Sequence, residues 1–182
     1  MVKVGLIIGS LRENSFSGLI ADKVASLFPE GVQTEKIELG HLPFYNQDLD
    51  TEGNVPEEYV AFREEIKGFD AFLIVTPEYN RTIPAVLKNA LEVGSRPVGD
   101  NAWDHKPAAI ISQSPGNLGG FGANHHLRQI LTGLNMPILQ QPEAYISNIM
   151  NLLDDNGELT NEGTVAFLQS FADAFVALIE KY

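Results

Sequence analysis

Short apolar runs alternate with stretches of helical periodicity along the whole chain. Four short runs are largely apolar, as expected of strands buried on both faces of a parallel sheet, and the first of them is rich in residues that favour strands. A fifth run, residues 32–39, is more polar and alternates, which predicts an edge strand. The four apolar runs are residues 2–8, 71–76, 107–112 and 136–140.

Apolar residues at helical spacing fill the intervals between these runs. The second helix has the clearest limits, with Asn54 as a candidate N-cap, Pro56 in the first turn and Gly68 after the last turn. The predicted helices carry residues 16–27, 59–66, 84–93, 123–134 and 165–179.

Five strand–helix units predict an α/β fold, a three-layer α/β/α sandwich around a parallel sheet with right-handed crossovers. Glycines and prolines fall between the elements and form no linker, so we expect residues 1–182 to be a single domain. Ligands of such sheets bind beyond the carboxyl ends of the strands. The loops after the first, third and fourth strands of the sheet are therefore where a site is expected.

Composition narrows the range of functions. The 182 residues include no cysteine, which excludes disulfides and thiolate chemistry and makes a reducing cytoplasm the expected compartment. Twelve basic and 24 acidic side chains give a net charge of −12, so nucleic acid and anionic membranes are not expected as partners. We expect no signal peptide, and no run approaches the roughly 18 apolar residues of a membrane span.

The loop after the first strand combines a turn glycine, hydroxyls and a cation. Gly9 allows the chain to turn, and Arg12 offers a bidentate fork to an anion. Hydroxyls come from Ser10, Ser15 and Ser17, just before a helix start with free backbone N–H groups. This pattern is typical of a phosphate cradle, although a serine-capped helix with a solvated arginine has the same local sequence. Dinucleotide and Walker-type phosphate motifs are absent from it.

The loops after the next two apolar runs are also distinctive. Residues 76–84 place two prolines around a polar stretch, which fixes its shape and aims its remaining backbone groups at a ligand. Residues 112–122 contain four glycines, and missing side chains let a flat ring approach the backbone. Either could be an ordinary surface loop by itself, but three such loops at one end of a sheet favour a shared site.

The chain resembles the NADPH-dependent FMN reductase family, and within it the quinone, chromate and azo-dye reductases, in residues 9–17, 77–90 and 114–120. The string Pro77-Glu78-Tyr79-Asn80 followed by Leu-Lys-Asn-Ala is its most specific part, and the similarity extends from Met1 to about Glu143. The resemblance implies a flavodoxin-like fold with strand order 2-1-3-4-5, bound FMN, and a homodimer or a tetramer built as a dimer of dimers.

The resemblance also implies which residues hold the cofactor. The first loop would bind the FMN phosphate, and the isoalloxazine ring would lie between the other two loops. Ser17 stands where many relatives have asparagine, which keeps a polar group of similar reach. The implied phosphate residues are Ser10, Arg12, Ser15, Ser17 and the backbone of Phe16; the implied ring residues are Pro77, Glu78, Tyr79 and Asn80 on one side and Ser114, Gly116 and Gly119 on the other.

The reaction implied is hydride transfer from NADPH or NADH to FMN, followed by two-electron transfer to a quinone, chromate, azo dye, ferric chelate or free flavin in a ping-pong scheme. The flavin carries this chemistry, so no catalytic acid or base is expected from the protein. Arg81 is a candidate for the phosphates of the nicotinamide nucleotide, with a solvated or interface arginine as the alternative. Trp103 is a candidate wall of the acceptor site, with aromatic packing under a loop as the alternative.

Rival functions remain. A flavodoxin-type electron carrier, or a flavin-binding partner module, would hold FMN without oxidising NADPH directly. A receiver domain would need clustered acids after the first strand, where this chain has Gly9-Ser10-Leu11-Arg12. No metal site is expected, because the adjacent His125 and His126 point apart on a helix and residues 154–157 fit a turn better than a calcium loop.

Overall fold

A five-stranded parallel sheet of order β2-β1-β3-β4-β5 forms the middle layer of the computed structural model, which describes residues 1–51 and 53–182. This order confirms the flavodoxin-like topology that the resemblance implied. Because β1, β3 and β4 are central, their side chains are buried on both sides, as the continuous apolar runs predict. The strands are β1 (Val2–Ile8), β2 (Val32–Ile37), β3 (Ala71–Pro77), β4 (Ala108–Gln113) and β5 (Ala144–Ile146).

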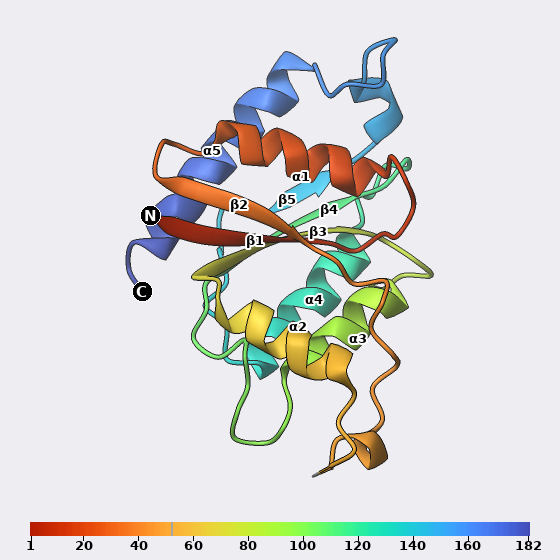
Figure 1. Ribbon diagram of the computed structural model, residues 1–182. Helices are drawn as coiled ribbons and strands as arrows, with labels where there is room; N and C mark the ends of the chain where they lie inside the picture. Colours follow the sequence, from red (N-terminus) through yellow and green to blue (C-terminus); the bar gives the residue numbers. More distant parts are fainter. Residues whose placement is uncertain (52) are drawn as a thin grey trace.

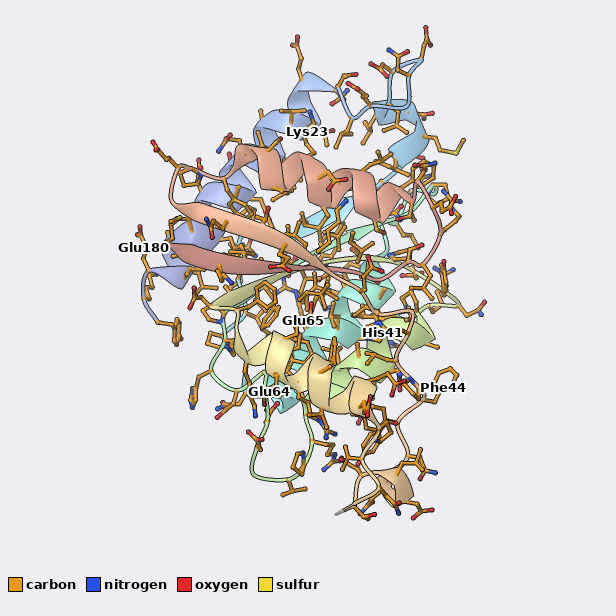
Figure 2. All side chains as sticks on the ribbon, in the orientation of Figure 1. Lys23, His41, Phe44, Glu64, Glu65 and Glu180 are labelled. Carbon is orange, nitrogen blue, oxygen red and sulfur yellow. The ribbon has the colours of Figure 1, made fainter. Side chains whose placement is uncertain are left out.

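Helices cover both faces of the sheet (Figure 1). On one face, Ile20 of α1 and Phe171 of α5 belong to one buried cluster, and on the other Phe62, Leu87 and Leu127 join α2, α3 and α4 in a second. Lys23 on α1 and Glu64 on α2 lie on the two outer layers (Figure 2). The helices are α1 (Phe16–Leu27), α2 (Glu57–Lys67), α3 (Ala85–Gly94), α4 (Phe121–Gly133) and α5 (Glu162–Ile179), with 3-10 turns η1 (Gln47–Leu49) and η2 (Ile149–Leu152).

The last strand does not lie where the sequence pattern predicted it. Residues 136–140 form a single bridge, between Ile138 and Ala108, and the strand itself follows at Ala144–Ile146. Pro142 has no N–H to donate to a ladder, so pairing with β4 stops after Leu139 and resumes at Ala144.

The second predicted helix also begins differently. Pro56, with φ −54°, is its N-cap, and no side chain caps it, so Asn54 does not have the predicted capping role. The fixed φ of proline prepares the first turn without a side-chain acceptor. Gly68 ends the helix as predicted.

In the described part of the chain α5 alone is long and apolar enough, by length and composition, to cross a membrane, with a mean hydropathy of 1.3 over 18 residues. The expectation that no run approaches such a length was wrong in this respect. In the structure α5 packs against the sheet, where Leu168, Phe171 and Phe175 are buried.

Candidate functional site

The loops after β1, β3 and β4 meet at the carboxyl end of the sheet (Figure 1). Together they enclose a hollow of about 180 Å³, which we call the cradle. Four residues predicted for the cofactor, Ser17, Asn80, Gly116 and Gly119, do not line it, and Gln113 and Pro115 line it without having been predicted. The predicted residues that do line it are Ser10, Arg12, Ser15, Phe16, Pro77, Glu78, Tyr79 and Ser114.

A larger hollow of about 300 Å³ lies on the other side of the first loop, toward β2. It shares Ser10, Arg12 and Ser15 with the cradle. Its remaining lining includes the carboxylates of Glu13, Asp22 and Glu38 and one cation, Lys36, which pairs with Asp22. The excess of carboxylates disfavours an anion there. The cradle is therefore the better candidate for a phosphorylated ligand.

The start of α1 presents hydrogen-bond donors to the cradle. Ser15 is the N-cap, and its Oγ accepts from the backbone N–H of Gly18 at 3.1 Å. The N–H groups of Phe16 and Ser17 in the first turn have no acceptor within the helix, and the helix dipole adds positive potential. The guanidinium of Arg12 lies 5.3 Å from the centre of the Phe16 ring, and the described residues include no ion-pair partner for it. One end of the cradle is thus suited to an anion.

The Ser17 side chain faces away from this anion site. It is fully buried, and its Oγ accepts a hydrogen bond from Nε2 of Gln113 at 3.1 Å. Ser17 therefore offers its backbone N–H to the first turn, while its hydroxyl belongs to a contact with β4. This differs from the phosphate role that the resemblance implied for the hydroxyl.

The β3 loop is a tight hairpin turn. The backbones of Tyr79 and Thr82 exchange two hydrogen bonds of 2.9 and 3.1 Å, and the two residues between them, Asn80 and Arg81, have φ of 50° and 70°. Two left-handed residues in a row form a type I′ turn, which asparagine tolerates and arginine adopts at a cost. The turn holds Arg81 outward with 76% of its side chain exposed, near Glu78 at 3.4 Å.

Glu78 and Thr82 tie this turn to the first two turns of α4. Oε2 of Glu78 accepts from the backbone N–H of Ala123 at 3.1 Å, and Nδ1 of His126 lies 2.9 Å from Oγ1 of Thr82. A Cβ on Gly122 would come within 2.9 Å of both Glu78 Oε2 and the Arg81 carbonyl, so this glycine permits the close approach. The β3 loop and α4 therefore form one rigid wall beside the cradle.

The glycine loop packs closely against β5 at Gly119. Gly119 has φ +58°, and a Cβ on it would lie 2.7 Å from the carbonyl carbon of Tyr145. Its missing side chain faces β5 and lets the loop pack against the sheet, where the Gly119 carbonyl accepts from Ser112 Oγ at 2.8 Å. The loop contributes Ser114 and Pro115 to the cradle lining.

Trp103 does not form a wall of the site. It is fully buried between Phe62 and Phe72, with ring centres at 6.1 and 4.9 Å, and its Nε1 donates to the carbonyl of Leu91. Its proposed acceptor role is wrong, and the packing alternative is correct. The physical reason is that the loop before β4 folds this large apolar ring into the core below the sheet.

Gln113 is the residue that sequence reasoning missed. It is the last residue of β4, level with Pro77 of β3 in the register, and it is only 5% exposed. Its Oε1 has no hydrogen-bond partner among the described residues. Its position at the carboxyl end of a buried strand was the available signal, because a glutamine there points into the cradle or into the core.

Comparison with known proteins places these features in a family. The sequence model of the family described as NADPH-dependent FMN reductase matches residues 2–151. A quinone reductase of Pseudomonas putida is 48% identical over 177 residues, covering 97% of this chain and 94% of that protein. A 2-hydroxy-1,4-benzoquinone reductase of Burkholderia sp. is 42% identical over 178 residues, covering 98% of this chain and 96% of that protein.

A solved structure shows the same likeness in three dimensions. FerB, a flavoenzyme NAD(P)H:(acceptor) oxidoreductase from Paracoccus denitrificans, superposes with a TM-score of 0.91 at 37% identity, covering 100% of this chain and 98% of that one. The similarity to relatives thus extends well beyond Glu143, through α5.

Proposed function

The chain belongs to the NADPH-dependent FMN reductase family, and on that premise we propose that its cradle holds FMN and that it passes electrons from NAD(P)H to quinones. As an oxidoreductase of this family it uses FMN and NAD(P)H. The observation that carries the proposal is the convergence of Arg12, the first turn of α1 and the rigid β3 loop on one hollow.

The donor set of the cradle suits FMN. A phosphate needs cationic and N–H donors, and Arg12 together with the N–H groups of Phe16 and Ser17 supplies them at a helix N-terminus. Hydroxyls of Ser10 and Ser15 complete that end. The ring would then lie between the β3 and β4 loops, bordered by Pro77, Glu78 and Tyr79 on one side and by Ser114 on the other. Asn80, Gly116 and Gly119, which the resemblance also implies, belong to the same two loops but do not line the cradle.

FMN, when bound, supplies the chemistry of accepting a hydride and releasing two electrons to an acceptor in a second half-reaction. The residues of the chain bind and orient. The type I′ turn and the Glu78 contact with α4 fix the β3 loop, so its backbone groups are held in place before the ligand arrives. No side chain of the cradle is needed as a general acid or base.

Arg81 is proposed to meet the phosphates of the nicotinamide nucleotide. Its guanidinium is exposed beside the cradle and has one long contact, to Glu78. The Arg81→Ala variant should raise KM for NADPH and leave KM for a quinone unchanged. An unchanged KM for NADPH would show that Arg81 is only a surface residue.

We also propose a cytoplasmic homo-oligomer. Tyr79, Leu118 and Phe121, from the loops around the cradle and the start of α4, each expose half or more of their surface, and Phe44 projects outward with 76% exposed (Figure 2). Apolar side chains gathered near one site favour contact with a second copy. Sedimentation equilibrium tests this, and a monomer at micromolar concentration would contradict it.

The decisive test is anaerobic addition of NADPH to gel-filtered, FMN-loaded protein. Stoichiometric loss of the flavin absorption band, restored by a quinone, is expected of the reductase, and parallel double-reciprocal plots are expected of the ping-pong scheme. Retained FMN without bleaching would instead support an electron carrier reduced by another protein. NADH, run in parallel, gives the nucleotide preference.

A further inference from the structure

The buried amide of Gln113 has no role in the fold that accounts for both of its polar atoms. Nε2 donates to Ser17 Oγ at 3.1 Å, and Oε1 is left without a partner among the described residues although the side chain is 5% exposed. An unpaired buried carbonyl oxygen costs free energy, and native structures rarely leave one unless a ligand completes it. Gln113 also lines the cradle, so its shielded oxygen lies at the wall of that hollow.

Gln113 belongs neither to the end of the cradle proposed for the phosphate nor to the end proposed for the ring. The anion end is formed by Arg12 and the first turn of α1, and the ring end by Tyr79 and Ser114. Gln113 comes from the end of β4 and contacts Ser17 on α1, so it links the strand that leads into the loop of Ser114 with the helix that forms the anion end.

The chemistry of a free amide oxygen selects what it can contact. Oε1 accepts hydrogen bonds and cannot donate them. A phosphate at neutral pH also accepts, so the two would not pair. The groups of a flavin nucleotide between its phosphate and its ring are the ribityl hydroxyls, which donate.

We propose that Gln113 binds the ribityl chain of the flavin through Oε1, and that Ser17 is its positioning residue rather than a phosphate ligand through its hydroxyl. This inference rests on the proposed placement of FMN in the cradle. The short serine on α1 and the long glutamine on β4 act as one unit, in which the hydroxyl holds the amide plane and leaves its oxygen facing the ligand.

Binding of three flavins distinguishes a contact with the ribityl chain from a contact with the phosphate or with the ring. FMN has ring, ribityl chain and phosphate; riboflavin lacks the phosphate; lumiflavin lacks the whole ribityl chain. Quenching of flavin fluorescence gives the Kd of each for the apoprotein. Gln113→Met keeps the length and shape of the side chain and removes its polar atoms, and Gln129→Met on the exposed face of α4 is the matched control.

For Gln113→Met we expect the Kd of FMN and of riboflavin to rise by the same factor, about tenfold, and the Kd of lumiflavin to change less than twofold. A rise for FMN alone would assign the amide to the phosphate end and overturn the proposal. An equal rise for lumiflavin would assign it to the ring or to the shape of the hollow, and no rise at all would leave the amide without a ligand role; both also overturn it.

Ser17→Ala alone provides a second readout that does not depend on the folding of Gln113→Met, and the double variant tests whether the two side chains act together. It should weaken FMN and riboflavin alike, and adding it to Gln113→Met should cause no further loss, since the two side chains act through one contact. A Ser17→Ala effect on FMN but not on riboflavin would show a direct phosphate contact instead. Failure of the cradle itself is distinguishable, because wild-type protein would then bind FMN no more tightly than lumiflavin.

Discussion

Oε2 of Glu78 accepts the backbone N–H of Ala123 at 3.1 Å, so the residue that follows β3 caps the first turn of a helix through a contact 45 positions along the chain. The N-cap of α4 is Gly120, which has no side chain to do this. The same carboxylate lies 3.4 Å from Arg81 through its other oxygen. One side chain therefore stabilises the helix start and holds the β3 loop.

Removing this cap should affect stability and cofactor binding together. Glu78→Ala is expected to cost about 1 kcal/mol of stability, which corresponds to a Tm lower by about 2–4 °C in a protein of this size, and to weaken FMN binding. Glu78→Gln keeps an acceptor oxygen and should lose less in both measurements. Thermal scans with and without FMN test this; equal Tm values for the two variants and the wild type would contradict the capping role.

Arg12 should distinguish FMN from riboflavin. Charge-assisted hydrogen bonds to a phosphate contribute about 1.5–3 kcal/mol, so Arg12→Ala should weaken FMN about 10- to 100-fold. Riboflavin has no phosphate, and its Kd should not change. Arg12→Lys keeps the charge without the planar guanidinium, so its Kd for FMN should lie between those of the wild type and of Arg12→Ala. If riboflavin weakens as much as FMN, Arg12 is a structural residue that supports Phe16.

Trp103 should matter for stability and not for the acceptor. Trp103→Ala removes a fully buried ring and is expected to cost about 3–5 kcal/mol. Trp103→Phe should be milder, and its KM for a quinone should equal that of the wild type. Steady-state kinetics of this milder variant check the assignment, and a KM raised severalfold would restore the acceptor role.

The ion pair between Arg63 and Asp50 should be costly to break. Both side chains are nearly buried, at 7% and 5% exposed, and two hydrogen bonds of 2.9 and 2.8 Å join them. Asp50→Ala leaves the guanidinium buried without its partner, which typically costs about 3–5 kcal/mol. Urea denaturation measures this.

Asp22→Ala is the matched control for that experiment. It breaks the exposed pair with Lys36, which should contribute about 1 kcal/mol or less. Equal losses in the two variants would show that burial does not strengthen the Arg63 pair.

Tyr145 should titrate later than an ordinary tyrosine. Burial, and then the hydrogen bond and charge of Glu143, raise the pKa of Tyr145 to about 12. The unfolded chain ionises this tyrosine near pH 10, whereas the folded protein resists ionisation up to a pH of about 12. The contribution of neutral Tyr145 to the free energy of unfolding is therefore complete below about pH 10 and is lost as the pH rises toward 12. Burial also raises the pKa of Tyr59, so ultraviolet titration should show more than one late tyrosinate, of which one disappears in Tyr145→Phe. Five tyrosines ionising together near their usual pKa would contradict it.

The parts of the fold that the sequence predicts are those encoded in local periodicity. Residues 2–8 are a continuous apolar run and form a strand with the same bounds. β5 was misplaced because only three of its residues pair, and the apolar run at 136–140, which ends shortly before Pro142, resembles a strand by composition but forms only one bridge.

The sequence predicted which three loops form the site, but it did not predict the side-chain contacts between them. Ser17 and Gln113 are 96 positions apart and Glu78 and Ala123 are 45 apart, so neither contact leaves a trace in spacing along the chain. Trp103 sits in a loop in the sequence, and only the packing of that loop against Phe72 decides that the ring is buried.

The two outer strands limit how copies of this protein can join. β2 carries Glu35 and Lys36 along its length, and β5 pairs through only three residues. The charged side chains of one edge strand and the short length of the other make pairing with a strand from another molecule unfavourable. The sheet is therefore protected from edge-to-edge aggregation. The homo-oligomer proposed above would therefore form through helices and loops rather than by pairing of edge strands.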